Sequence, residues 1–157
     1  MSGALHSRFW RGAVAGIVVC TLAIPPALNG AEEPSLEDLK TRVANAKISD
    51  RPPLCLQICE RQLGAVSRFY AAGDSEQAKA ALADVVAFAE LTRDYAIQSR
   101  KHEKQSEIAI RRMIRKLADL KHTVPHEDQE QVQTTMDRLQ RIRDDLLAAM
   151  FPKVGKK

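Results

Sequence analysis

The side chains in this 157-residue chain that could do chemistry include two cysteines four positions apart, Cys55 and Cys59. On one helix, Cβ atoms at this spacing lie about 5–6 Å apart, whereas a disulfide needs about 3.8 Å. We therefore favour two small buried thiols, and a strained local disulfide or an intermolecular bridge is the alternative. Attachment of a metal or haem is the remaining alternative, although covalent haem normally requires C-x-x-C-H and Glu60 follows Cys59 here.

A second group combines two histidines with nearby acids. The spacing of His122 and His126 would place two metal ligands on one helix face, and Asp128, next to Glu127, could add oxygen ligands. Pro125 lies between the histidines, however, so they are expected to straddle a turn. Loop histidines beside acids are more often solvated turn residues, and we favour that interpretation. The metal candidates remain His122, His126 and Asp128, and no cofactor is predicted.

Catalytic motifs are not found in the rest of the sequence. None of the serines after residue 30 lies in a G-x-S-x-G or S-x-x-K context. The chain has no Gly-rich phosphate loop and no H-E-x-x-H, and its carboxylates are scattered over polar positions. We therefore predict that the protein is not an enzyme.

The first thirty residues have the composition of a secretory signal peptide. Arg8 and Arg11 precede an apolar run over residues 12–24, and prolines and small residues follow that run. A helix that spans a bilayer needs about 20 apolar residues, and this run is shorter. We expect cleavage near Gly30 or Ala31, which predicts an exported protein, periplasmic or secreted, with no stable membrane span after cleavage.

The remaining chain is long enough for one domain with a real core. We place a single helical domain at residues 31–152 and a flexible tail at 153–157. Aromatic residues make up 4% of the chain, which argues against a sheet-rich fold, and helix-forming residues dominate. The formal charge of +4 falls to about +2 when the two leader arginines are removed. This excess is too small to predict a nucleic-acid partner.

Apolar residues recur at helical spacing, and turn residues divide them into segments. A short helix is expected after Ser35, which can cap it, and should end near residues 47–50. A second helix is expected over about residues 54–72. Its apolar stripe includes Leu63, and Gly73 is the expected C-terminal stop.

The second half of the chain predicts a long helical hairpin. Residues 75–124 contain no Gly and no Pro, so we predict one continuous helix that runs to about residue 123 across the polar segment 98–107. Pro125 then forces a turn, and a last antiparallel helix is expected over about residues 127–150. The predicted fold class is therefore all-α, a helical bundle with a coiled-coil-like hairpin.

The end of the second expected helix and the turn after it resemble the middle of a tetratricopeptide repeat. The run from Phe69 to Asp74 (FYAAGD), followed by Ala78 and Leu82, carries the resemblance. It covers about residues 58–90 and implies a helical hairpin with close packing. It is a single degenerate copy, whereas stable arrays need about three repeats. No characterised family is recognised across the full chain.

Two stretches of opposite charge occupy the predicted terminal hairpin. Residues 100–122 carry eight basic side chains and three acids, a net charge of +5. Residues 126–150 carry six acids and three arginines, a net charge of −3. Two antiparallel helices would lay these charges alongside each other, and we favour that interpretation. Binding of an anionic lipid or another polyanion is the alternative.

Protein–protein interaction or scaffolding is the function that these features favour, with a protein partner or a homo-oligomer as the assembly. The candidate interface is an apolar flank of the terminal hairpin that carries Ile108, Ile114 and Leu147 and is rimmed by arginines. This flank could instead pack on the preceding helices. The alternative function is a periplasmic helical bundle that binds a small ligand or a metal.

Overall fold

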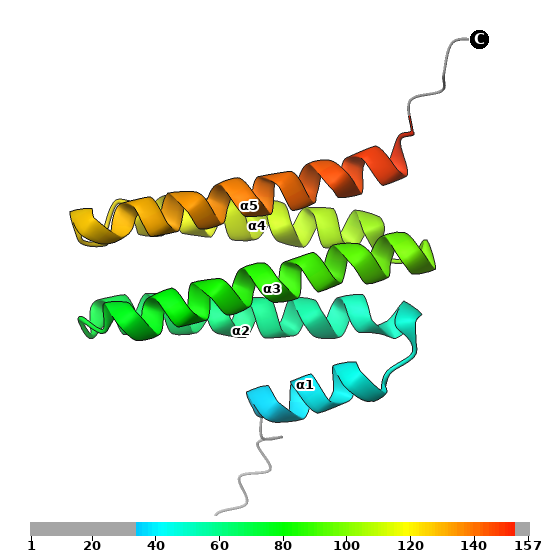
Figure 1. Ribbon diagram of the computed structural model, residues 1–157, viewed down its shortest axis with the longest axis horizontal. Coiled ribbons are helices and arrows are strands. Elements are labelled where there is room, and N and C mark those ends of the chain that lie inside the picture. Colours follow the sequence, from blue (N-terminus) through cyan, green and yellow to red (C-terminus); the bar gives the residue numbers. More distant parts are fainter. Residues whose placement is uncertain (1–33, 153–157) are drawn as a thin grey trace, which may run out of the picture. The chain divides into compact units, whose positions relative to one another are not determined.

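Five α-helices and one 3-10 turn make up residues 34–152, the part of the chain that the computed structural model describes (Figure 1). The expected signal peptide and the expected tail lie outside the described residues. The all-α prediction is confirmed, since the described part contains helices and no strand. Within it, no helix combines the length and the apolar composition that a bilayer crossing requires.

Helix α1, Leu36–Asn45, begins at the predicted cap. The Ser35 hydroxyl accepts the Asp38 N–H at 3.1 Å, and the Asp38 carboxylate accepts the Ser35 N–H at 3.1 Å. This reciprocal capping box satisfies two backbone donors that a helix start otherwise leaves free. The 3-10 turn Ile48–Asp50 then leads into the second helix.

Helices α2, Arg51–Ala71, and α3, Ser75–Ser99, form the predicted hairpin. Helix α2 starts three residues earlier than expected because its two prolines fit within the first turn, where the N–H groups have no partner inside the helix. Gly73 ends the hairpin turn with φ +75°, a conformation that glycine adopts without steric cost. Asp74 then caps α3 by accepting the Gln77 N–H at 3.1 Å.

The expected continuous helix over residues 75–124 is wrong, because the chain breaks at residues 100–102 and helix α4 covers Glu103–Lys121. Arg100 and His102 adopt the left-handed conformation, with φ of 54° and 65°. The Ser99 hydroxyl donates to the Tyr95 carbonyl at 2.7 Å and occupies an acceptor of the last turn of α3. The break reverses the chain direction, so the apolar stripe of α4 packs beside α3 instead of extending into solvent.

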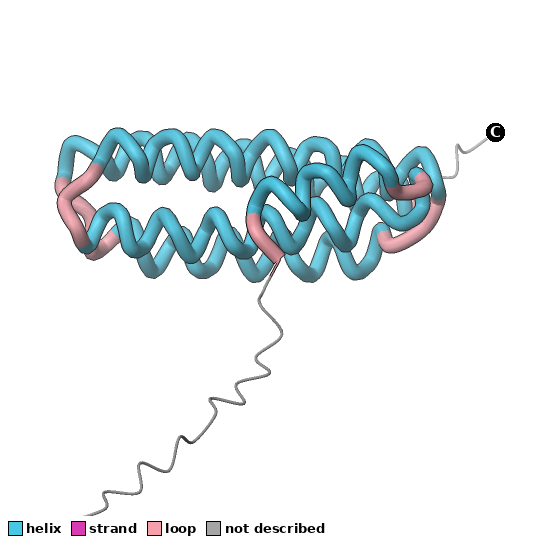
Figure 2. Tube along the Cα trace, turned by 90° about the horizontal axis from the view of Figure 1, so that it is seen from below, coloured by secondary structure: helices cyan, strands magenta, loops and turns pink. Residues whose placement is uncertain are grey.

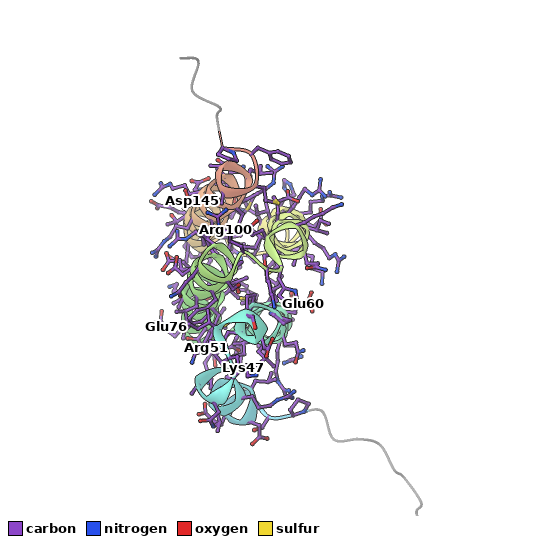
Figure 3. All side chains as sticks on the ribbon, turned by 90° about the vertical axis from the view of Figure 1, so that its right-hand side faces the viewer. Lys47, Arg51, Glu60, Glu76, Arg100 and Asp145 are labelled. Carbon is purple, nitrogen blue, oxygen red and sulfur yellow. The ribbon has the colours of Figure 1, made fainter. Side chains whose placement is uncertain are left out.

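Helix α5, His126–Met150, follows Pro125 as predicted and completes a second hairpin with α4. The two hairpins stack so that α3 lies beside α5 and α2 lies beside α4, and each of these pairs runs parallel (Figure 1). Viewed along the helices, α3 and α5 form one layer and α2 and α4 form the other (Figure 3).

The main core lies between the two hairpins. All four long helices contribute fully or nearly fully buried side chains, among them Leu63 and Val66 (α2), Leu82 and Val85 (α3), Ile110 and Leu117 (α4), and Leu139 and Leu146 (α5). A smaller cluster places Leu39 and Val43 of α1 against Cys55 and Ile58 of α2. Helix α1 covers only one half of the first hairpin, at the end where α2 begins (Figure 2).

Arg51 holds the end of α1 against the first hairpin. Its Nε donates to the Ala46 carbonyl at 3.0 Å, and its Nη2 donates to the Ala44 carbonyl at 3.2 Å. Its Nη1 donates to the Tyr95 hydroxyl at 3.2 Å, and its guanidinium carbon lies 5.0 Å from the centroid of the Tyr95 ring. A cation at the carbonyl end of α1 also complements the helix dipole.

The tetratricopeptide resemblance is not confirmed beyond the hairpin itself. Helix α2 begins at Arg51 and α4 begins at Glu103, 52 residues later, whereas the repeat has a period of about 34 residues. Helices α2 and α3 have 21 and 25 residues, too long for that period. What the residues near Gly73 specify is a tight turn between two closely packed helices.

We expect Leu63→Asp to lower the free energy of unfolding by about 3 kcal/mol or more, because Leu63 is 4% exposed in the main core and an unpaired carboxylate is costly there. Urea unfolding followed by circular dichroism measures the loss. Ser67→Asp, on the exposed side of the next turn, is the control and should change the free energy by less than about 0.5 kcal/mol. Equal stability of the two variants would contradict the assignment of the buried face.

Candidate functional site

Cys55 and Cys59 are free thiols, and both are fully buried. The Cys59 thiol contacts the Val85 carbonyl at 3.5 Å, and Cys55 belongs to the cluster under α1. Burial raises the pKa of Cys55 to about 11 and raises the pKa of Cys59 further. Of the alternatives left open by the sequence, the structure therefore contains two buried free thiols and no bridge between them.

The candidate metal ligands do not converge. His122 and His126 are both exposed on either side of Pro125, whereas Asp128 is 1% exposed and faces α3. Over residues 34–152, no three His, Cys, Asp or Glu side chains lie in an arrangement that could hold a metal ion. The spacing of the two histidines therefore reflects a turn that begins a helix.

Asp128 instead joins the two hairpins at the end where α3 and α5 begin. Its Oδ2 accepts the Ser75 hydroxyl at 2.6 Å, and its Oδ1 lies 3.5 Å from the Lys79 Nζ. The buried Tyr70 hydroxyl, without a hydrogen-bond partner among the described residues, has its pKa raised by burial and then by the Asp128 charge. This cluster holds the first turn of α5 on the first turn of α3.

Two residues of the predicted apolar flank, Ile108 and Ile114, lie on different faces of α4. Ile114 packs against the main core. It lies seven residues from both Glu107 and Lys121, so the three side chains share one face of α4. That face contacts α5, because Glu107 accepts a hydrogen bond from Arg143 Nε at 2.7 Å and Lys121 Nζ donates one to Gln133 at 2.7 Å. Ile108 and Leu147 are partly exposed. With 100° per residue, Ile108 lies about 120° around α4 from Ile114. The structure thus places Ile114 in the contact between α4 and α5, away from Ile108.

Helices α4 and α5 are antiparallel neighbours as expected, but no ion pair among residues 34–152 joins a basic α4 side chain to an acidic α5 side chain. Within residues 34–152, the ion pairs of α5 acids are made with α3, and α5 arginines hold acids on α3 and α4. The pairs between helices are Arg93–Asp145 (3.0 Å), Lys79–Asp128 (3.5 Å), Arg138–Glu90 (2.9 Å) and Arg143–Glu107 (2.7 Å). Helix α5 packs on both α3 and α4, but most α4 cations are exposed to solvent and do not face α5.

The result is a bundle with one basic and one acidic side. Helices α2 and α4 together hold nine basic side chains and four acids, a net charge of +5. Helices α3 and α5 hold five basic side chains and ten acids, a net charge of −5. Because each pair of helices forms one layer (Figure 3), the two charges lie on opposite sides. We call these surfaces the basic side and the acidic side.

A groove of about 430 Å³ runs along the basic side between α2 and α4. Leu63 and Leu120 provide its apolar lining, and Lys116 and Asp119 lie at its rim. Gly64 also lines it, and a Cβ added there would meet only the end of the Arg68 side chain, at 3.9 Å. The acidic side carries a groove of about 400 Å³ between Glu90 and Arg141. Both grooves are open surfaces suited to a protein side chain or helix.

The separation of charge is the feature that sequence reasoning missed, and its signal was present as the net charge of each helix.

No protein-family model matches the chain, and neither the curated proteins nor the solved structures contain a match.

We expect both cysteines to resist a thiol reagent in the native protein and to react in denaturant, because burial disfavours the reactive thiolate. Unfolded thiols ionise near pH 8.5, whereas the folded protein keeps those protons until about pH 11 for Cys55. The unfolded state therefore binds fewer protons above pH 8.5, and the free energy of unfolding should fall as pH rises. Labelling rates and urea unfolding between pH 7 and 10.5 measure both effects.

The control replaces Cys55 and Cys59 with alanine and should flatten this pH dependence. Rapid labelling of Cys55 or Cys59 in the native protein, or a disulfide at either residue in unreduced protein, would contradict the burial of free thiols.

Proposed function

We propose that the protein is an exported helical scaffold that assembles with itself, with the basic side of one copy docked on the acidic side of another. The observation that carries the proposal is the equal and opposite net charge, +5 on α2 and α4 and −5 on α3 and α5. A surface with this pattern complements a second copy of the same chain without any further partner.

Several charged side chains on each side of the bundle make no ion pair among the described residues and are therefore available to a partner. On the basic side, Arg68, Lys104, Arg115 and Lys116 make no ion pair among the described residues, and all are exposed. On the acidic side, Asp137 and Asp144 accept hydrogen bonds only from glutamines of their own helix, at 2.8 Å each. These groups can exchange water for a partner of opposite charge at small desolvation cost, because they lie at the surface.

The contact that this arrangement creates is heterologous, because different surfaces meet. Such contacts continue as rings or open filaments. Two helices about 30 Å long and 10 Å apart present a face on the order of 600 Å², below the roughly 800 Å² per partner of a standard stable interface. We therefore expect weak association that depends on ionic strength.

Sedimentation velocity should show oligomers at low salt that dissociate as the ionic strength rises above about 0.3 M, where screening is strong. Arg115→Glu with Lys116→Glu lowers the net charge of the basic side from +5 to +1, and Asp137→Lys with Asp144→Lys raises that of the acidic side from −5 to −1. Each double variant alone should be monomeric, whereas a mixture of the two should associate.

Gly64→Leu should also weaken association by filling the groove between α2 and α4. Ala44→Leu, at an exposed position of α1, is the control.

A wild-type protein that stays monomeric at about 100 μM in low salt would overturn the proposal. Oligomers that persist in both charge-reversal variants would also overturn it, because assembly would then use another surface.

A further inference from the structure

One end of the bundle collects every exposed large hydrophobic side chain of the described residues. These are Ile48 at 40% exposed, Ile97 at 36% and Phe151 at 72%. They belong to three separate elements: the turn before α2, the last turn of α3 and the residue after α5. The start of α2, the end of α3 and the end of α5 all lie at the right-hand end of the bundle in Figure 1.

The same end carries cations without ion pairs. Lys47, Arg100 and Lys101 are exposed and take part in no salt bridge of the described residues, and Figure 3 looks onto this end with Lys47 and Arg100 labelled. Together with exposed Lys104 they make four cations that can reach a partner, against the acids Asp50 and Glu103. The acids of α5 lie about one turn further from the end, where Asp145 is paired with Arg93.

Two residues in the loop between α3 and α4 adopt a strained backbone conformation at this end. Arg100 and His102 hold positive φ angles of 54° and 65°, which favour glycine over other residues. Neither position is a glycine, so the loop between α3 and α4 presents a guanidinium and an imidazole at the end surface.

From these observations we propose that this end, which we call the α2-start end, docks on the surface of an anionic lipid bilayer. The three apolar side chains line none of the grooves described above and come from separate elements, so they offer no shaped site for a peptide. A fluid bilayer accepts separate apolar side chains without shape matching, and its anionic headgroups complement the cations.

The test is co-sedimentation of the protein, expressed from the full chain, with vesicles of phosphatidylglycerol and phosphatidylcholine mixed or with phosphatidylcholine alone. Binding to the anionic vesicles should exceed binding to neutral ones and should fall with added salt. A cation near an anionic surface contributes about fivefold in partitioning, and a phenylalanine at the interface contributes about tenfold. The variant Arg100→Asn, Lys101→Gln, Phe151→Ser should therefore lose about 100-fold or more.

A matched control removes two exposed cations and one partly exposed apolar side chain from α4: Arg111→Gln, Arg112→Gln, Ile108→Ser. It should bind anionic vesicles within about fivefold of wild type, and circular dichroism should show equal helical content in both variants. A direct readout is the emission of Phe151→Trp, which should shift to the blue with anionic vesicles while that of Ile108→Trp does not. Equal binding to neutral and anionic vesicles, or equal losses in the two triple variants, would overturn the proposal.

Discussion

The chain reversal at residues 100–102 is the constraint on which the rest of the structure depends. It requires left-handed backbone at Arg100 and His102, each of which costs on the order of 1–3 kcal/mol. The reversal brings Ile110, Met113 and Leu117 of α4 into the core that α2 and α3 begin. Full burial of one such side chain contributes about 1.5–3 kcal/mol, so three of them outweigh the backbone strain.

The direction of the second hairpin then determines the distribution of charge. Since α4 and α5 return alongside α2 and α3, parallel helices become neighbours. Asp128 and Asp145 of α5 then meet Lys79 and Arg93 of α3. The cations of α4 lie beside α2, which is itself basic, and only Arg112 approaches an acid there, Glu60 at 4.0 Å. The two sides with opposite charge, and the self-assembly that we propose from them, are consequences of this stacking.

Local elements could be predicted from the sequence because single residues determine them. Ser35 caps α1, Gly73 and Asp74 make the first turn, and Pro125 begins α5, as expected. The break after Ser99 could not be predicted from breaker residues, because the segment contains neither glycine nor proline. Its uniformly polar composition was the only signal, and that composition suits an exposed helix equally well. The burial of α3 and α4 in one shared core decides the conformation of this segment. The periodicity of the sequence contains no information about that packing.

The candidate sites failed for a related reason. Asp128 was grouped with His122 and His126 because they are close in sequence, yet its partners are Ser75 and Lys79, about fifty residues away. Ion pairing was predicted between helices consecutive in the chain, whereas the acids of α5 pair with α3, two helices earlier. Both errors arise because neighbours in a stacked bundle are set by topology. The two free thiols were predicted correctly, because Cys55 and Cys59 lie four residues apart on one helix, which is too far for an unstrained disulfide.

The reversal itself can be measured directly by the distance between spin labels at Gln77→Cys and Thr123→Cys, with the three native cysteines replaced by alanine. Both positions are exposed and lie at the end where Ser75 bonds to Asp128. Stacked hairpins predict a distance below about 30 Å, two to three interhelical spacings of 8–10 Å. One continuous helix between the labels would separate them by about 70 Å, and that result would contradict the account.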